Sequence, residues 1–364
     1  MIDLGTDPAT GKRRQVRRRY ETVDLAVDDF ARIRREVREG TYVAPTNATV
    51  RDLCDAWLRS RRGVRGSTLA GYRDSLKPLC EVYGELPFQR LTKRHIEELV
   101  DQLQAGSLKR ADDRPRRPWK PRSVNLMLFV LRKVYEDAIR QGLALRNVAG
   151  LVDRLPETKS EMQTYTVAEV RKLLRAARRD RLEHAWHLAL HGLRRGEIAG
   201  LRWSSVDLKA GTLVVEESRV SVDGQAVASS PKSKRSTRTL PLTPELIKVL
   251  KRAKRRQRAE QLAVGRAYRV SGYVAVNEIG EALHPDTLSD RWSTVVGAAK
   301  VRKIRLHDAR HTCGTLMHLQ GVPIAVIAAW LGHADSAFTM RTYVHSQDEA
   351  LHNAAVVLGD VTGL

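Results

Sequence analysis

Two pairs of residues with the same spacing lie in the second half of this 364-residue chain. Arg194 and Glu197 are three residues apart in HGLRRGEIAGLRW, and His307 and Arg310 are three apart in RLHDARHTCGTL. Both stretches are expected to begin helices, so the members of each pair share a helical face. An isolated Arg–Glu pair of this kind is most simply an ion pair. Whether the pair has a role in chemistry depends on the other polar residues of the region.

Three further residues could take part in chemistry. Lys232 lies in SSPKSKRST between two expected strands, His333 ends the apolar segment PIAVIAAWLGH, and Tyr343 follows ten residues later. Taken singly, each has an ordinary interpretation: an exposed turn lysine, a histidine at a helix end beside Gly332, and a core tyrosine. Lys234 would point to the same strand face as Lys232, so it is an alternative at that position.

Together these residue types suit the attack of a tyrosine hydroxyl on a DNA phosphodiester. Two guanidiniums can hold both non-bridging oxygens and stabilise the charge of a pentacoordinate transition state. A lysine can protonate the departing 5′ oxygen. An imidazole can help to remove the proton of tyrosine, whose pKa of about 10 makes it a poor nucleophile unassisted. Such a site needs neither a metal ion nor another cofactor.

The composition also predicts a polyanionic partner. The chain has 64 Lys and Arg against 42 Asp and Glu, a net charge of +22. This excess favours nucleic acid over a membrane, because no apolar run approaches the roughly 18 residues of a spanning segment. The N-terminal segment lacks the apolar core of a secretory signal. Three scattered cysteines without metal-ligand spacing are expected to be reduced, so we expect a cytoplasmic, nucleoid-associated protein.

The pattern of the chain predicts a mostly helical α+β protein with three regions. Residues 1–45 are expected to form a small basic unit of a β-hairpin and a helix, in which the basic segment RRQVRRRY contacts DNA. Residues 49–154 read as a bundle of four or five helices. A second linker near LPETKSEMQ leads to residues 164–364, a mixed α/β domain that contains all of the candidate chemistry.

Local signals place the elements of the first two regions. Gly40 is expected to end the helix of the first region, and Thr49, Ser67 and Thr92 occupy N-cap positions in the bundle. Residues 109–122, KRADDRPRRPWKPR, are too rich in proline and charge to be regular. The sequence leaves open whether they form a solvated loop or a basic loop beside DNA.

In the third region, Thr166 is expected to cap the first helix. A strand pair turns at Asp223-Gly224, and a third strand ends at Pro241. The basic helix 247–260 can present either a solvated face or a DNA contact.

Three histidines in EHAWHLALH have a spacing that resembles a metal site. His184, His187 and His191 would lie on one helical face. A metal site needs further converging ligands, usually a carboxylate or a cysteine from elsewhere. No such partner is evident, so we interpret these histidines as buried or interface residues.

The motifs together resemble the tyrosine recombinases, and within them the phage and mobile-element integrases. The matching stretches are LHGLRRGEIAGLRWSSVDL, PKSKRSTRTLPL, HDARHTCGTLMHLQGVPIAVIAAWLGH and MRTYVH, in the order and at the spacing of that family. The resemblance covers residues 164–350, and more weakly it extends to a helical core-site-binding domain and, in residues 1–45, an arm-site-binding domain. One departure is His191-Gly192, where family members often have Thr-Gly.

The resemblance implies a role for each residue. Arg194 and Arg310 would bind the scissile phosphate, and Glu197 would support them by hydrogen bonding. Arg194 rather than Arg195 is chosen because the arginine of the family stands three residues before the acid. Lys232 would be the general acid.

The remaining roles concern the nucleophile. His307 would assist proton transfer, His333 would contact the phosphate or orient the nucleophile, and Tyr343 would form a 3′-phosphotyrosine. The implied function is a site-specific recombinase that integrates, and in some cases excises, a phage or related element without ATP or metal.

The implied partners are two attachment sites bridged by a homotetramer, with an excision factor and a host DNA-bending protein as further candidates. Two other activities share the chemistry, those of a Xer-like resolvase of chromosome or plasmid dimers and of a type IB topoisomerase. A catalytically silent DNA-binding regulator is the third alternative. The basic N-terminal unit argues against the resolvase, and the full set of polar residues argues against the regulator.

Overall fold

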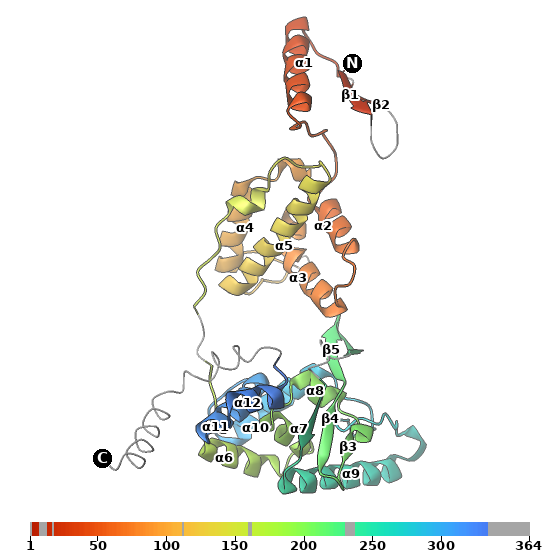
Figure 1. Ribbon diagram of the computed structural model, residues 1–364, viewed down its shortest axis with the longest axis vertical. Helices are drawn as coiled ribbons and strands as arrows, with labels where there is room; N and C mark the ends of the chain where they lie inside the picture. Colours follow the sequence, from red (N-terminus) through yellow and green to blue (C-terminus); the bar gives the residue numbers. More distant parts are fainter. Residues whose placement is uncertain are drawn as a thin grey trace, which may run out of the picture. The chain divides into compact units, whose positions relative to one another are not determined.

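The computed structural model describes residues 2–6, 13–16, 18–110, 113–158, 162–229 and 237–333. The chain divides into two compact units, residues 1–159 and residues 160–364 (Figure 1). The expected linker near LPETKSEMQ falls at the division between them.

The first unit begins with the expected hairpin and helix. Strands β1 (Ile2–Thr6) and β2 (Arg13–Val16) pair antiparallel, and α1 (Val23–Arg38) follows (Figure 1). The Thr22 side chain caps α1 by accepting from the Leu25 N–H group, and Gly40 lies just past the helix end with a φ of 69°. The predicted end of this helix is therefore confirmed.

In the described residues, the rest of the first unit is a bundle of four α-helices, α2 (Val50–Arg59), α3 (Gly66–Tyr83), α4 (Lys93–Ala105) and α5 (Pro121–Arg140). Its core includes Leu79, Leu99 and Leu128, all fully buried. Aliphatic side chains at helical spacing explain the bundle, because each helix must bury its apolar face against another.

Two of the three N-caps predicted in the bundle are confirmed. Thr49 and Thr92 each accept from the third N–H group of the following helix in a capping box. The Ser67 prediction is wrong, because α3 already begins at Gly66 and no side chain caps it. The described part of residues 109–122 is irregular until α5 begins, apart from one isolated bridge between Lys109 and Pro115.

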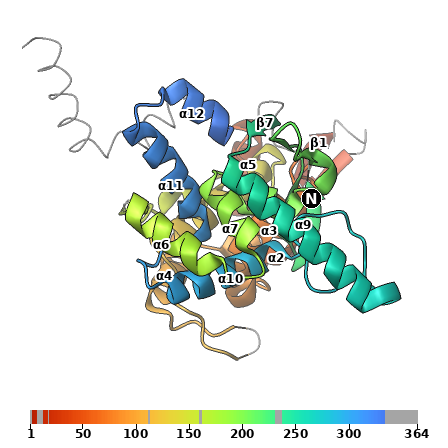
Figure 2. The same ribbon diagram turned by 90° about the horizontal axis from the view of Figure 1, so that it is seen from below.

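The second unit combines helices with two small sheets. The helices are α6 (Val167–Ala177), α7 (Glu183–Leu190), α8 (Arg195–Gly200), α9 (Pro244–Val264), α10 (Pro285–Ala299), α11 (Leu306–Leu319) and α12 (Ile324–Leu331). Helix α7 packs against α6, α9 and α11 (Figure 2). Thr166 caps α6 with a capping box, as predicted.

The strands of this unit form two sheets. Strands β3 (Val206–Asp207), β4 (Thr212–Val215) and β7 (Arg238–Pro241) make one antiparallel sheet, and β5 (Ser218–Val222) pairs with β6 (Gln225–Ser229) in another. The turn predicted at Asp223-Gly224 is confirmed, with a positive φ at both residues, 49° and 76°. The predicted strand pair is β5 and β6, and the same stretch also contains β4, which the sequence did not separate from them.

An aromatic core holds the helices of this unit together. The rings of Trp186 on α7 and Trp292 on α10 lie 5.7 Å apart, and both side chains are almost fully buried. The Trp292 indole donates to the Ile304 carbonyl at 2.9 Å, and the Tyr165 hydroxyl donates to the Arg302 carbonyl at 2.8 Å. These bonds fix the segment that leads into α11, which carries His307 and Arg310.

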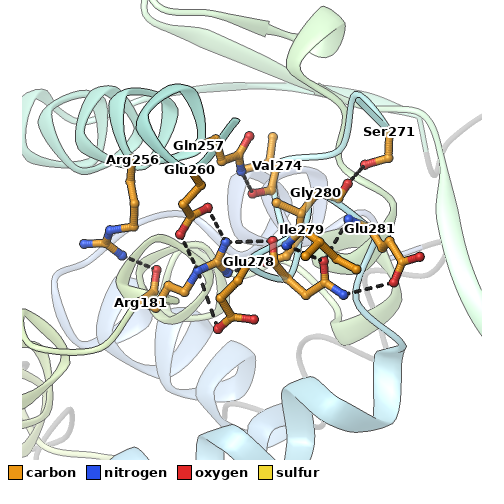
Figure 3. A network of polar contacts seen from close by, with 12 residues as sticks. Arg181, Arg256, Gln257, Glu260, Ser271, Val274, Glu278, Ile279, Gly280 and Glu281 are labelled. Atoms are coloured by element: carbon orange, nitrogen blue, oxygen red, sulfur yellow. Dashed lines mark hydrogen bonds and ion pairs between the residues drawn. The ribbon is translucent and has the colours of Figure 1, made fainter. Parts of the chain in front are cut away.

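Arg181 fastens α9 to the irregular segment after it. Its guanidinium binds both oxygens of Glu260 at 2.7 and 2.6 Å and also donates to the Val276 and Asn277 carbonyls (Figure 3). This Arg–Glu pair resembles, in its geometry, a pair in the candidate site described below.

Among the described residues, no helix is both long and apolar enough to cross a membrane.

Candidate active site

Arg194 and Glu197 meet at the first turn of α8. Arg194 is the N-cap residue, and it donates its main-chain N–H to Glu197 Oε2 at 2.8 Å and its Nη1 to Oε1 at 2.6 Å. The neighbouring Arg195 points elsewhere, to Asp286 and Ser289 of α10 at 2.6 and 3.1 Å. Arg194, the residue selected from the sequence, is therefore the one that faces Glu197.

Arg310 joins this turn to α11 and α12. Its side chain is 1% exposed, whereas that of Arg194 is 36% exposed. Nη1 donates to the Gly192 carbonyl at 2.6 Å, Nη2 donates to the Leu331 carbonyl, and Nη1 lies 3.9 Å from Glu197 Oε2. The two arginines that the sequence pairs with different partners thus lie around one carboxylate.

The loop before Arg194 depends on a glycine. Gly192 has a φ of 94°, and an added Cβ would lie 2.7 Å from Leu331 Cδ2. The preceding His191 carbonyl accepts from the Trp330 indole at 2.8 Å. A side chain at Gly192 would strain the backbone and would have to displace the buried Leu331 side chain.

Three consecutive carbonyls at the end of α12 each accept from a different arginine. The Trp330 carbonyl accepts from Arg238 Nε at 2.7 Å, and the Gly332 carbonyl accepts from Arg194 Nη2 at 3.0 Å. The Leu331 carbonyl between them accepts from Arg310, as described above. A helix leaves its last carbonyls without intrahelical partners. The arginines therefore act as C-terminal caps for α12 and fix the position of His333, two residues past the helix end.

Sequence reasoning missed Arg238, the first residue of β7. Its side chain is 7% exposed and binds Glu197 in the bidentate manner, Nη1 to Oε1 at 3.1 Å and Nη2 to Oε2 at 2.9 Å. Gly332, with a φ of 63°, leaves room for it, since a Cβ there would lie 2.9 Å from Arg238 Nη1. A usable signal was the alternation in RTLP, which places Arg238 on the same inward face as Leu240.

The carboxylate of Glu197 is the electrostatic centre of this group. Burial alone would raise its pKa, but hydrogen bonds and charge from Arg238, with the charges of Arg310 and Arg194, lower the pKa to about 2. Glu197 is therefore ionised at neutral pH. One anion is surrounded by three cations, and the excess positive charge suits an anionic ligand such as a phosphate.

Three histidines lie beside the arginines. Desolvation and then the charge of Arg310 lower the pKa of His333, to about 3, and also that of His307. His311, which the sequence interpretation missed, packs edge-on against His307 with ring centres 4.8 Å apart, and its pKa is lowered to about 4. These imidazoles are neutral near pH 7 and can accept a proton. The signal for His311 was its position one helical turn after His307.

Two residues of the expected set, Lys232 and Tyr343, lie outside the described residues. The structure brings together Arg194, Glu197 and Arg310 by direct contact. His307 and His333 lie close enough to Arg194 and Arg310 for both charges to lower their pKa values.

The histidines of α7 form a separate group. His191 contacts the His187 carbonyl through Nδ1 at 2.7 Å and Thr243 through Nε2 at 3.2 Å, while His184 is buried and its Nε2 makes no hydrogen bond with the described residues. Within the described ranges, no three His, Cys, Asp or Glu side chains are arranged to hold a metal ion.

Burial of His184 predicts acid sensitivity. Desolvation, followed by the charges of Arg181 and Arg256, lowers its pKa to about 3, whereas an unfolded histidine has a pKa of about 6.5. The unfolded state therefore binds the extra proton first, and stability falls as the pH drops from about 6.5 toward about 3, by at most about 1.4 kcal/mol per pH unit for this residue. His184→Gln is expected to flatten this fall in urea unfolding of the full chain between pH 7 and pH 5. An unchanged pH slope would contradict the assignment.

Comparison with known proteins places this chain in a family. Residues 163–350 match the model of the phage integrase family. A XerC-like tyrosine recombinase of Caldanaerobacter subterraneus subsp. tengcongensis is 26% identical over 89% of this chain and 86% of its own length. The ICEBs1 integrase of Bacillus subtilis is 26% identical over 94% and 92%.

Solved structures share the fold. A Tn1549 transposon integrase in complex with transposon right end DNA superposes with a TM-score of 0.67 at 17% identity, over 85% of this chain and 99% of that one. A lambda integrase tetramer bound to a Holliday junction gives 0.60 at 18% identity, over 93% and 90%. The residues matched by the family model, 163–350, span more than half of the chain. They include Arg194, Arg238 and Arg310, and also His307 and His333. The chain belongs to the phage integrase family of tyrosine recombinases, enzymes that cleave and rejoin DNA.

Proposed function

We propose that this recombinase integrates, and in the reverse direction excises, a phage or related mobile element at specific attachment sites. Tyr343 attacks the scissile phosphate and forms a 3′-phosphotyrosine link with release of a 5′ hydroxyl. Arg194 and Arg310 hold the phosphate, and Lys232 protonates the departing oxygen. The link conserves the energy of the phosphodiester, so rejoining needs no ATP.

The histidines complete the proposed mechanism. A neutral His307 can accept the phenol proton, because its lowered pKa keeps the imidazole unprotonated near neutral pH. His333, placed at the capped end of α12, contacts the phosphate or orients the nucleophile. The single observation that carries this proposal is the convergence of Arg194 and Arg310 on Glu197 at the end of α12.

The proposed partners follow from charge and from the relatives. A net charge of +22 suits double-stranded DNA, and structural neighbours include an integrase dimer on a core site and a tetramer on a Holliday junction. We infer that this chain also acts as a homotetramer on two attachment sites, in the cytoplasm of a bacterial host. An excision factor and a host DNA-bending protein are further proposed partners.

A covalent trapping experiment tests the proposal. The full-length protein is incubated with attachment-site DNA that carries a nick next to the cleavage position, so that the short 5′-hydroxyl strand is lost and rejoining fails. A DNA–protein adduct that survives denaturing gel electrophoresis and is removed by protease is the expected result. Without an adduct on the junction sequences flanking the element, the proposed enzyme activity fails and a silent DNA-binding regulator remains.

A deletion tests the proposed role of the N-terminal hairpin and helix. Removal of residues 1–45 is expected to spare adduct formation on an isolated core site, because Arg194, Glu197 and Arg310 all lie in the other compact unit. Integration between complete attachment sites is expected to fall, because arm-site contacts are lost. Recombination of complete sites by the truncated protein at the full-length rate would refute arm-site binding.

A further inference from the structure

Arg238 and Arg194 bind the same carboxylate, that of Glu197. Glu197 accepts four hydrogen bonds on two oxygens, two from Arg194 and two from Arg238. Both arginines also bind carbonyls at the end of α12, two residues apart. The position of the Arg194 guanidinium is therefore set jointly by Glu197 and by the α12 end, and Arg238 binds both of these supports.

Loss of Arg238 would change the balance of charge at Glu197. A buried carboxylate that loses a bidentate partner must be compensated by the cations that remain. The nearest are Arg194, whose Nη1 is already 2.6 Å away, and Arg310, 3.9 Å away. Each would be drawn toward Glu197 and away from an incoming phosphate.

We propose that Arg238 is a positioning residue for strand cleavage: it holds Glu197 and the Trp330 carbonyl so that Arg194 and Arg310 stay available to the scissile phosphate. This inference rests on the proposed function. Arg238 itself makes no contact with the phosphate in this role, whereas Arg194 and Arg310 do.

The contacts require the guanidinium and not only its charge. Nη1 and Nη2 bind the two oxygens of Glu197 while Nε binds the Trp330 carbonyl, so a planar group with three donors in fixed directions is used. A lysine carries one point charge on a flexible stem and cannot make this set. Arg238→Lys is therefore expected to restore activity only in part.

Arg181 provides a matched control. It too forms a two-oxygen ion pair, with Glu260, and donates to two main-chain carbonyls in the same compact unit (Figure 3). Its partners include none of the site residues. Arg181→Met thus removes a bidentate Arg–Glu pair that is less buried, with side chains 22% and 19% exposed, without touching the proposed support of Arg194.

The experiment compares Arg238→Met, Arg238→Lys, Glu197→Gln, the double variant Arg238→Met/Glu197→Gln and Arg181→Met in the full chain. The rate of adduct formation on nicked attachment-site DNA and the affinity for that DNA are measured for each, with thermal melting to confirm folding. The double variant removes the unpaired buried carboxylate. If Arg238→Met alone does not fold, Arg238→Lys is compared with wild type, and the double variant with Glu197→Gln.

Arg238→Met is expected to slow adduct formation by about 100-fold, the size of effect that a small misplacement of a reacting group produces, with unchanged DNA affinity. In the Glu197→Gln background the same change is expected to cost little more, and Arg181→Met to react at the wild-type rate. Equal slowing in both backgrounds, or an affinity loss that matches the rate loss, would overturn the positioning role. A wild type that forms no adduct would overturn the proposed function as well.

Discussion

Tyr343→Phe is expected to abolish covalent adduct formation on nicked attachment-site DNA while site binding persists. The change removes one oxygen atom, and that oxygen is the proposed nucleophile, so no bond to the phosphorus can form. Affinity is expected to remain because most of it comes from many other contacts to the phosphate backbone. Denaturing gels measure the adduct, and a gel shift measures binding.

A second tyrosine of the same compact unit serves as the control. The Tyr273 hydroxyl donates to Glu217 at 2.7 Å and accepts from Arg202 at 2.6 Å, which gives it a local structural role. Tyr273→Phe should retain the adduct. An adduct formed by the Tyr343→Phe protein would show that another residue is the nucleophile.

Arg194→Ala and Arg310→Ala are expected to slow cleavage by about 10²–10³-fold each, the cost of losing one preorganised donor to a charged transition state. Arg194 is the clearer test, because its side chain is partly exposed whereas Arg310 is buried against two carbonyls. Single-turnover cleavage and DNA affinity are measured on the same site.

Neighbouring and conservative variants separate chemistry from folding. Arg195 follows Arg194 in the chain but pairs with Asp286. Arg195→Ala removes that pair and is expected to leave the cleavage rate close to that of wild type. Arg310→Lys keeps the charge of the buried residue but not its planar fork, so it should fold better than Arg310→Ala and still cleave poorly. Parallel losses of binding and cleavage would contradict the assigned phosphate contacts.

Local signals predicted the elements that carry the arginines. The start of α8 just after Arg194, the start of α11 near His307 and the glycine end of α12 all follow from patterns within about ten residues, such as i,i+3 pairs and a Gly after an apolar run. The structure agrees at each of these places, and it selects Arg194 over Arg195 on the Glu197 side.

Contacts between distant segments could not be predicted in this way. The inward direction of Arg238 depends on a sheet in which β4 pairs with both β3 and β7, and its bond to Trp330 spans 92 residues. The sequence gives four basic residues between positions 232 and 238 and no local reason to bury one of them. The error at Ser67 is of a different, local kind: serine is a common N-cap residue, but the helix starts one residue before it.

The contacts at the end of α12 also explain how three neighbouring guanidiniums can be ordered by the fold itself. Three guanidiniums around one carboxylate repel one another, and water alone would let them spread into many rotamers. The carbonyl dipoles of α12 give each guanidinium an acceptor before any DNA arrives. The entropic cost of ordering these side chains is then met during folding and not during catalysis, so a phosphate meets donors whose directions are already fixed.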